Sequence, residues 1–216
     1  MTHFTRPGRP LLVTDCDEVL LHMVAHFADW LDEEHQVHFD LESGQFADAL
    51  TDRRSGETLA ADRVWPLLDQ FFRGQMHRQT LVPGAIEALE RIGAVADIVI
   101  LTNLGDEAHG WRVEQLAGHG IAHEIVCNQG GKGRPVRELV ARHGAPTAVF
   151  VDDLPVHHAS VAKHAPGVWR LHMIAEPRLA AAVAQAPDSH ARIDDWPAAS
   201  EWILAKFEAK FEEKAQ

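Results

Sequence analysis

Short runs of mainly apolar residues constrain the fold of this chain more than any other feature of its sequence. An apolar run without polar alternation is typical of a β-strand that is covered on both faces, as in a parallel sheet. Such runs recur at Leu11–Thr14, Ala96–Leu101, Ile125–Cys127, Ala148–Val151 and Val168–Leu171. We therefore expect these segments to be buried strands of one mostly parallel sheet.

Segments with helical periodicity separate these runs. Residues 83–94 repeat apolar residues at helical spacing, and Gly93 can end that helix. Residues 134–146 show the same pattern, with Gly144 and then a proline as the stop. Strands that alternate with helices predict an α/β fold with a Rossmann-like three-layer core, in which helices cover both faces of the sheet.

One region interrupts this rhythm between the first two predicted strands. From Leu21 to Thr80 the sequence shows helical patterns and no convincing strand. We interpret residues 21–80 as a small helical cap, inserted into an α/β core made of residues 1–20 and 81–216. Residues 194–216 predict a last amphipathic helix with a charged, frayed end.

Composition limits the class of partner. A formal net charge of -12 at pH 7 argues against nucleic acid and anionic membranes, because both attract basic surfaces. No run approaches the ~18 apolar residues of a membrane span, and residues 1–10 lack the apolar stretch of a signal peptide. Cys16 and Cys127 cannot form a disulfide framework, which favours a reducing compartment. We expect a cytoplasmic protein that acts on a small molecule; the oligomeric state stays open.

Polar side chains follow four of the predicted strands. In open parallel sheets, ligands bind just past the carboxyl ends of the strands, so these side chains are the candidates for a site. In chain order they are Asp15 and Asp17, then Thr102 and Asn103, then Lys132, then Asp152 and Asp153. Each pair or residue taken alone has an ordinary explanation as a turn, cap or surface residue. Their shared position after strands favours one common site.

The chemistry of this set is that of phosphoryl transfer. Clustered carboxylates make an oxygen-rich pocket that suits a hard cation such as Mg²⁺. A lysine, a threonine hydroxyl and backbone N–H groups can hold the oxygens of a phosphoryl group. One carboxylate can attack the phosphorus, while a second acid protonates the leaving oxygen and then activates water.

The order DxD, TN, Lys and DD resembles that of the haloacid dehalogenase (HAD) superfamily of hydrolases, over nearly the whole chain. The resemblance implies an aspartyl-phosphate mechanism and a cap inserted after the first motif. It also implies a role for each residue. Asp15 would be the nucleophile and a Mg²⁺ ligand, and Asp17 the general acid/base, whose backbone carbonyl also reaches the metal. Phosphate would be bound by Thr102, the backbone at Asn103 and Lys132, and Asp153, supported by Asp152, would complete the metal shell.

Two departures from that pattern stand out. Glu18 and Val19 occupy positions where the family commonly has Gly and Thr, which places a third carboxylate near the site. His157 and His158 stand where the family often has a further acid. We interpret both histidines as solvated helix residues rather than zinc ligands, because neighbouring residues on a helix point to different sides.

Other features have plain structural explanations. We expect Cys16 to be a packed small residue whose thiol is made unreactive by the acids on either side. The basic residues of the insertion are expected to be exposed loop charges: Arg53, Arg54, His77 and Arg78. No aromatic clamp or basic cluster is evident in the insertion, so the leaving group of the substrate is left open.

The sequence therefore predicts a Mg²⁺-dependent phosphatase that hydrolyses a small soluble phosphomonoester. A phosphomutase or another phosphotransferase of the same fold is the alternative, and so is a non-catalytic binding protein. A dehalogenase is disfavoured by Asp17, because the resemblance implies that such enzymes lack the second acid. A signalling receiver domain is disfavoured by the order of the motifs. We expect the insertion to act as a lid that selects the substrate.

Overall fold

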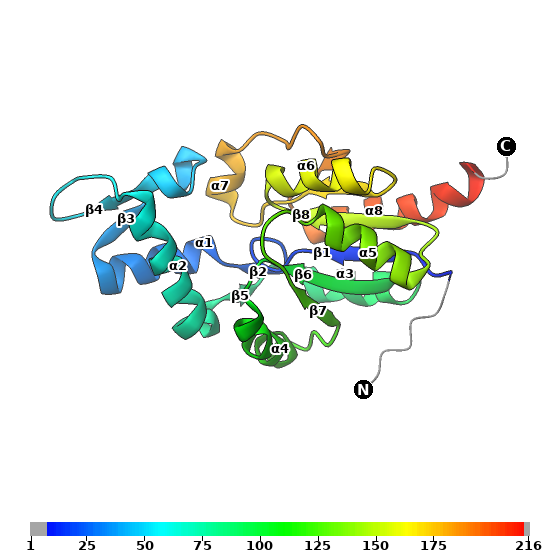
Figure 1. The fold of residues 1–216 in the computed structure, drawn as a ribbon, viewed down its shortest axis with the longest axis horizontal. Helices are drawn as coiled ribbons and strands as arrows, with labels where there is room; N and C mark the ends of the chain where they lie inside the picture. Colours follow the sequence, from blue (N-terminus) through cyan, green and yellow to red (C-terminus); the bar gives the residue numbers. More distant parts are fainter. Residues whose placement is uncertain (1–7, 214–216) are drawn as a thin grey trace.

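Six parallel strands form the central sheet of the computed structural model, which describes residues 8–213 (Figure 1). The spatial order is β10-β9-β8-β1-β6-β7, and each neighbouring pair is parallel. The strands are β1 (Leu11–Thr14), β6 (Asp97–Thr102), β7 (Glu124–Cys127), β8 (Ala148–Asp152), β9 (Trp169–His172) and β10 (Ala191–Arg192). The expected mostly parallel α/β sheet is confirmed, and the two-residue β10 is an addition that the sequence did not predict.

Helices cover both faces of this sheet, as expected. They are α3 (Ala85–Gly93), α4 (His109–Gly118), α5 (Gly133–His143), α6 (Pro155–His164) and α8 (Trp196–Glu213). The short helix α7 (Pro177–Ala182) lies against the inserted segment instead. On one face Leu12 packs in a cluster with residues of α3 and α8. On the other face Leu11 and Val13 pack with residues of α5 and α6. Adjacent residues of β1 thus serve opposite faces, which is why the whole strand is apolar.

The register of the sheet aligns the strand ends. Thr14, the last residue of β1, pairs with Ile100 of β6 on one side and with Val151 of β8 on the other. The chain therefore leaves all three strands at one edge of the sheet. This places the residues after β1, β6 and β8 close together, although about 140 positions separate the first from the last in the sequence.

The insertion between β1 and β6 lies at one end of the molecule, opposite the two ends of the described chain (Figure 1). Its elements are β2 (Leu21–His22), α1 (Val24–Trp30), a π-helical turn (Leu31–His35), β3 (Val37–Phe39), β4 (Leu50–Asp52), α2 (Ala61–Gly74) and β5 (Thr80–Leu81), with short 3-10 turns at Leu41–Ser43, Ala47–Ala49 and Met76–Arg78. The expectation that this region contains no strand is wrong. β3 pairs with β4 and β2 with β5, both antiparallel. In β3 the buried-exposed-buried alternation spans only three residues, too few to read as a strand.

Aromatic residues build the interior of the insertion. The Phe27 ring lies 5.4 Å from that of Phe71 and 6.1 Å from that of Phe39, measured between centroids. Leu179 of α7 packs against this cluster from the core side. The insertion therefore has an apolar centre of its own, to which the core contributes at its border.

The first and last residues limit two expectations. Residues 1–7 and 214–216 lie outside the described residues, so most of the stretch judged free of a signal peptide, and the end of the last helix, are not part of this description. Between residues 8 and 213, none of the helices combines the length and the apolar character needed to cross a membrane.

Candidate active site

Lys132 joins two of the predicted acids at the edge of the sheet. Its Nζ lies 2.8 Å from Oδ1 of Asp15 and 2.7 Å from Oδ2 of Asp152, and its side chain is fully buried. Burial lowers the pKa of Lys132, but the two carboxylates outweigh this and raise it overall. Lys132 is therefore a fixed positive charge between the ends of β1 and β8.

A glycine sets the position of this lysine. Lys132 is the residue before α5, and Gly133 is the first residue of that helix. A Cβ atom at Gly133 would collide with the backbone oxygen of Ser160 in α6, so only glycine permits this approach of the two helices. The Gly133 N–H also donates to Oγ of Ser160 at 3.0 Å. The GGKG stretch thus serves helix packing at the point where the lysine enters the site.

Asp15, Asp152 and Asp153 form a candidate cation site. Each offers a carboxylate oxygen, and these oxygens lie within 4.8 Å of one another. Burial raises the pKa of Asp15, with Lys132 opposing the rise. Burial, and then the charges of Asp152 and Asp15, raise the pKa of Asp153. Three buried carboxylates repel one another when ionised, and a divalent cation bound between them would offset that cost. Because all the ligand atoms are oxygens, the site suits Mg²⁺.

Thr102 and Asn103 lie at the end of β6 beside this group. Thr102 is buried, and its Oγ1 makes no hydrogen bond within the described structure. An unpartnered buried hydroxyl is costly, so it marks a place where a ligand oxygen fits. Asn103 is held at the surface by its side chain, which donates to the backbone oxygen of Gly130 at 3.0 Å.

Asp17 is held by two residues that the sequence did not single out. Nη2 of Arg112 donates to both carboxylate oxygens of Asp17, at 2.9 and 2.8 Å, and Nε2 of Gln79 donates to Oδ1 at 2.6 Å. Arg112 comes from α4 in the core and is fully buried, whereas Gln79 lies just before β5, where the insertion returns to the core. The carboxylate of Asp17 is thus oriented through both of its oxygens and is separate from the three clustered acids.

No local pattern in the sequence distinguishes Arg112 from a surface arginine. Two exposed residues, Trp111 and Val113, flank it on α4. Only the fold, which brings α4 against the loop after β1, reveals its partner. Burial lowers the pKa of Arg112, but the Asp17 carboxylate outweighs this and raises it overall, so Arg112 stays charged.

Two neighbours of the acids have structural roles. Cys16 is buried, as expected, and burial raises the pKa of its thiol. Glu18 adopts a left-handed backbone conformation with φ 58°. Its Oε1 accepts from the N–H groups of Met23 and Val24, at 2.6 and 2.7 Å, and its Oε2 accepts from Glu176 N–H at 3.0 Å. Glu18 therefore ties the start of α1 to the core instead of entering the site.

The interpretation of His157 and His158 as solvated residues is wrong. Both are buried, because α6 packs against the sheet through the face that carries them. Nε2 of His158 donates to the backbone oxygen of Asp152 at 3.0 Å, and Nε2 of His172 donates to that of Asp153 at 2.8 Å. Burial lowers the pKa of His158 to about 4 and also lowers that of His172. Neutral imidazoles thus hold the backbone of both acids, and the described residues show no zinc-type group here.

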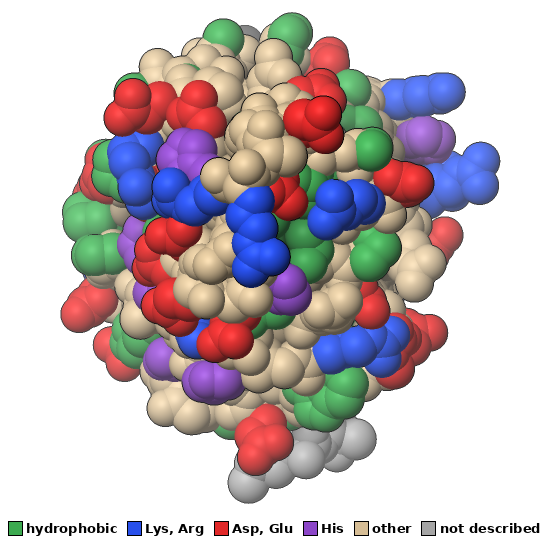
Figure 2. Space-filling model, turned by 90° about the vertical axis from the view of Figure 1, so that its left-hand side faces the viewer, with side chains coloured by type: hydrophobic (Ala, Val, Ile, Leu, Met, Phe, Trp, Pro, Cys, Tyr) green, Lys and Arg blue, Asp and Glu red, His purple; other side chains and the backbone are tan. Residues whose placement is uncertain are grey.

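The basic residues of the insertion do not reach this site. Arg53 pairs with Asp32 and Arg78 with Glu33, and Arg54 contacts Gln36, all near the surface. Figure 2 shows acidic and basic side chains interspersed over this end of the molecule rather than a basic patch. The expectation of exposed charges therefore holds for Arg53, Arg54 and His77, whereas Arg78 is half-buried in the turn at Met76–Arg78.

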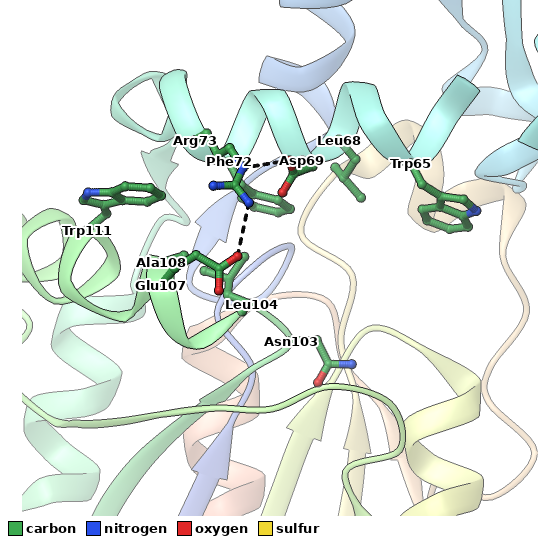
Figure 3. A pocket seen from close by; sticks show the side chains of 11 residues that line it. Trp65, Leu68, Asp69, Phe72, Arg73, Asn103, Leu104, Glu107, Ala108 and Trp111 are labelled. Atoms are coloured by element: carbon green, nitrogen blue, oxygen red, sulfur yellow. Dashed lines mark hydrogen bonds and ion pairs between the residues drawn. The ribbon is translucent and has the colours of Figure 1, made fainter. Parts of the chain in front are cut away.

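A cleft of about 200 Å³ separates α2 from the loop that follows β6 (Figure 3). Asn103 lines it, so the cleft adjoins the polar site. Its other lining residues are Trp65, Leu68, Asp69, Phe72, Arg73, Leu104, Gly105, Glu107, Ala108 and Trp111. Rings from α2 in the insertion and from α4 in the core both line this cleft, and the sequence did not predict that these two elements come together.

Comparison with known proteins gives a clear result at the level of structure. No protein-family model matches the sequence, and no curated protein matches it significantly. A candidate HAD-like hydrolase from Burkholderia xenovorans LB400 superposes with a TM-score of 0.61 at 16% identity, covering 92% of this chain and 98% of its own. The candidate HAD hydrolase YfnB from Bacillus subtilis, solved with bound magnesium, gives 0.60 at 14% identity, with 92% and 99% covered.

A third neighbour extends the range of chemistry on this fold. A candidate β-phosphoglucomutase from Thermotoga maritima superposes with a TM-score of 0.54 at 13% identity, covering 93% of this chain and 99% of its own. All three cover the core together with the insertion, because so little of either chain is left out. The chain described here therefore has the fold of the haloacid dehalogenase superfamily.

Proposed function

We propose that this protein is a Mg²⁺-dependent phosphatase that hydrolyses a small phosphomonoester through an aspartyl-phosphate on Asp15. The observation that carries the proposal is that Asp15 lies with Lys132, Asp152 and Asp153 at one edge of the sheet, near the unpartnered hydroxyl of Thr102. Nucleophile, cation ligands and phosphate ligands are then all supplied from adjacent strand ends. The magnesium bound by YfnB supports the choice of metal.

In the first step, a carboxylate oxygen of Asp15 attacks the phosphorus and the bond from phosphorus to the ester oxygen breaks. Lys132 and the hydroxyl of Thr102 hold the non-bridging phosphoryl oxygens as charge moves onto them. Asp17, oriented by Arg112, gives its proton to the departing ester oxygen. The products are the free alcohol and a phosphorylated Asp15.

In the second step, water attacks the phosphorus and the bond to Asp15 breaks. Asp17, now a carboxylate, takes the proton of that water, so Asp15 and Asp17 both return to their starting states. Mg²⁺, held by Asp15, Asp152 and Asp153, would neutralise the charge that lets a carboxylate and a phosphate approach each other.

The competing functions differ in the acceptor or in the bond attacked. A phosphomutase would pass the phosphoryl group from Asp15 to a second hydroxyl, and the mutase-like neighbour makes this the second candidate. The partly exposed carboxylate of Asp17, oriented by Arg112, is placed for acid/base work, which a dehalogenase attacking carbon does not need. A cleft of about 200 Å³ suits a small alcohol part.

The test is phosphate release from 4-nitrophenyl phosphate by the purified protein, with Mg²⁺ or with a chelator. We expect turnover with Mg²⁺ only, and none in Asp15→Asn. Asp106→Asn, a change to an exposed acid of the loop after β6, is the matched control and should retain turnover. Equal turnover in Asp15→Asn and wild type would overturn the proposal.

A further inference from the structure

The cleft between α2 and the loop after β6 offers space for the part of the substrate that carries no phosphate. Asn103 lines the cleft, and the preceding Thr102 carries the free hydroxyl of the phosphate site. Figure 3 shows α2 on one side of the cleft and the loop with the start of α4 on the other. The alcohol part of an ester bound at Thr102 and Asn103 therefore has this cleft beside it.

The walls of the cleft are unusually apolar for an exposed surface. Trp65 is 54% exposed and Trp111 is 43% exposed, and both line it. Leu68, Phe72 and Leu104 contribute further apolar surface. The two tryptophans lie at opposite ends of the cleft, and Trp65 also stacks on Phe46 (Figure 3). Exposed rings that line a hollow are typical of a surface that binds a ligand, and indole and phenyl rings stack well on other flat groups.

One cation and two carboxylates line the cleft, which leaves a net negative charge there. Nε of Arg73 lies 2.7 Å from Oδ2 of Asp69, and Nη2 of Arg73 lies 3.2 Å from Oε1 of Glu107 (Figure 3). Arg73 is the cationic side chain among the described lining residues, and two carboxylates already hold it. An incoming carboxylate or second phosphate would meet an excess of negative charge and would have to displace one of these acids.

We propose that this cleft is the leaving-group site for a phosphomonoester whose alcohol part is uncharged and carries a flat apolar ring. The inference rests on the proposed function, and it adds the class of substrate. It separates aryl and arylalkyl phosphates from phosphorylated acids and diphosphates. The apolar walls favour the first class, and the paired charges disfavour the second.

The first arm of the test compares three esters whose leaving groups are all alkyl alcohols: benzyl phosphate, ethyl phosphate and phosphoglycolate. Their similar alkyl leaving groups keep differences in leaving-group chemistry small, so differences in kcat/KM report the cleft. We expect benzyl phosphate to exceed ethyl phosphate by about tenfold, as expected for burying one ring. Phosphoglycolate should be the poorest of the three. Phosphoglycolate as the best substrate would overturn the inference.

The second arm uses variants of the lining. Trp111→Ala should raise KM for benzyl phosphate about fivefold more than KM for ethyl phosphate, because a stacking surface is lost. Val113→Ala changes another exposed apolar residue of α4 that does not line the cleft, and it should behave like wild type. The double variant Asp69→Asn with Glu107→Gln leaves Arg73 unpaired and should improve KM for phosphoglycolate. Unchanged preferences in both lining variants would contradict the proposal.

A binding measurement separates this inference from the proposed function. Asp15→Asn cannot form the aspartyl-phosphate, so calorimetry with benzyl phosphate, phosphoglycolate and inorganic phosphate reports affinity alone. Tighter binding of benzyl phosphate than of the other two ligands supports the proposed role of the cleft. This holds even if wild type hydrolyses no ester, because that result would contradict the proposed function alone. Equal affinity for all three, with turnover intact in wild type, would sink only the inference.

Discussion

At the scale of single residues, the site depends on contacts that hold Asp17 in place. Arg112 from the core and Gln79 from the border of the insertion fix its carboxylate together. In the proposed mechanism Asp17 moves a proton in both steps, so its orientation should matter most where the leaving oxygen needs that proton.

We predict that Arg112→Met lowers kcat about 30-fold for an alkyl ester, because general acid catalysis contributes on the order of 100-fold or more. The loss should be far smaller for 4-nitrophenyl phosphate, because its leaving group departs without a proton. Methionine fills a similar space and cannot bind a carboxylate. The measurement is kcat for both esters in wild type and variant. Arg142→Met removes an exposed arginine of α5 that pairs with Glu124 and is the control. An equal loss for both esters would show that Arg112 is only structural.

His158 makes stability depend on pH. The unfolded chain binds a proton on this imidazole near pH 6.5, whereas burial lowers the folded pKa to about 4. The unfolded state therefore holds more protons between these values, and stability falls as pH drops from 6.5 to 4. We predict that His158→Gln makes this decline shallower by an amount on the order of 2 kcal/mol, while glutamine can still donate to Asp152.

Urea unfolding of both proteins at pH 4.5 and pH 7 measures this decline. His38→Gln, at an exposed position of β3, should lose as much unfolding free energy between pH 7 and pH 4.5 as wild type does. If His158→Gln and wild type lost the same unfolding free energy between these pH values, the claim that His158 is buried as a neutral imidazole would be contradicted.

At the scale of elements, the closest approach in the site is between α5 and α6. We predict that Gly133→Ala displaces the start of α5 from Ser160 and moves Lys132, with kcat/KM reduced about 100-fold and unfolding free energy reduced by about 2 kcal/mol. Gly110→Ala is the matched control, because it adds the same methyl group to α4, where nothing lies within 4 Å. Full activity in Gly133→Ala would show that the position of Lys132 does not depend on this contact.

The strands and helices that the sequence predicted correctly are those with long and continuous apolar patterns. β1, β6 and β8 are covered on both faces, so most of their residues are apolar and they stand out as strands in the sequence. β10 has two half-buried residues and β3 has three residues, which give no periodicity to read. The buried face of α6 was missed because it consists partly of histidines, whose type indicates neither burial nor exposure.

The candidate site was predictable where its residues follow strands, and not elsewhere. Asp15, Thr102 and Asp152 are adjacent because the parallel register fixes the strand ends, which a sequence pattern can anticipate. Arg112 and Gln79 reach Asp17 from 95 and 62 positions away in the chain. Contacts of that kind depend on how α4 and the end of the insertion pack, which no local spacing records. The aromatic cleft was missed for the same reason.

At the scale of the whole molecule, the clustered acids predict that Mg²⁺ stabilises the fold. A cation that binds the folded state at about 100 times its Kd adds about 2.7 kcal/mol, which for a chain of this size raises Tm by roughly 5 to 10 °C. Asp153→Asn should remove most of this shift. Thermal unfolding with Mg²⁺ and with a chelator measures it, and a full shift in Asp153→Asn would place the cation elsewhere.

The most direct measurement is to identify the phosphorylated residue during turnover. Asp17→Asn is mixed with 4-nitrophenyl phosphate and Mg²⁺ and quenched in acid within seconds, and its peptides are analysed by mass spectrometry. The first step with this ester needs no proton from residue 17, whereas the second step lacks its base, so we predict that one phosphoryl group accumulates on Asp15. Turnover without any phosphorylated peptide, or with the phosphoryl group on another residue, would contradict the account.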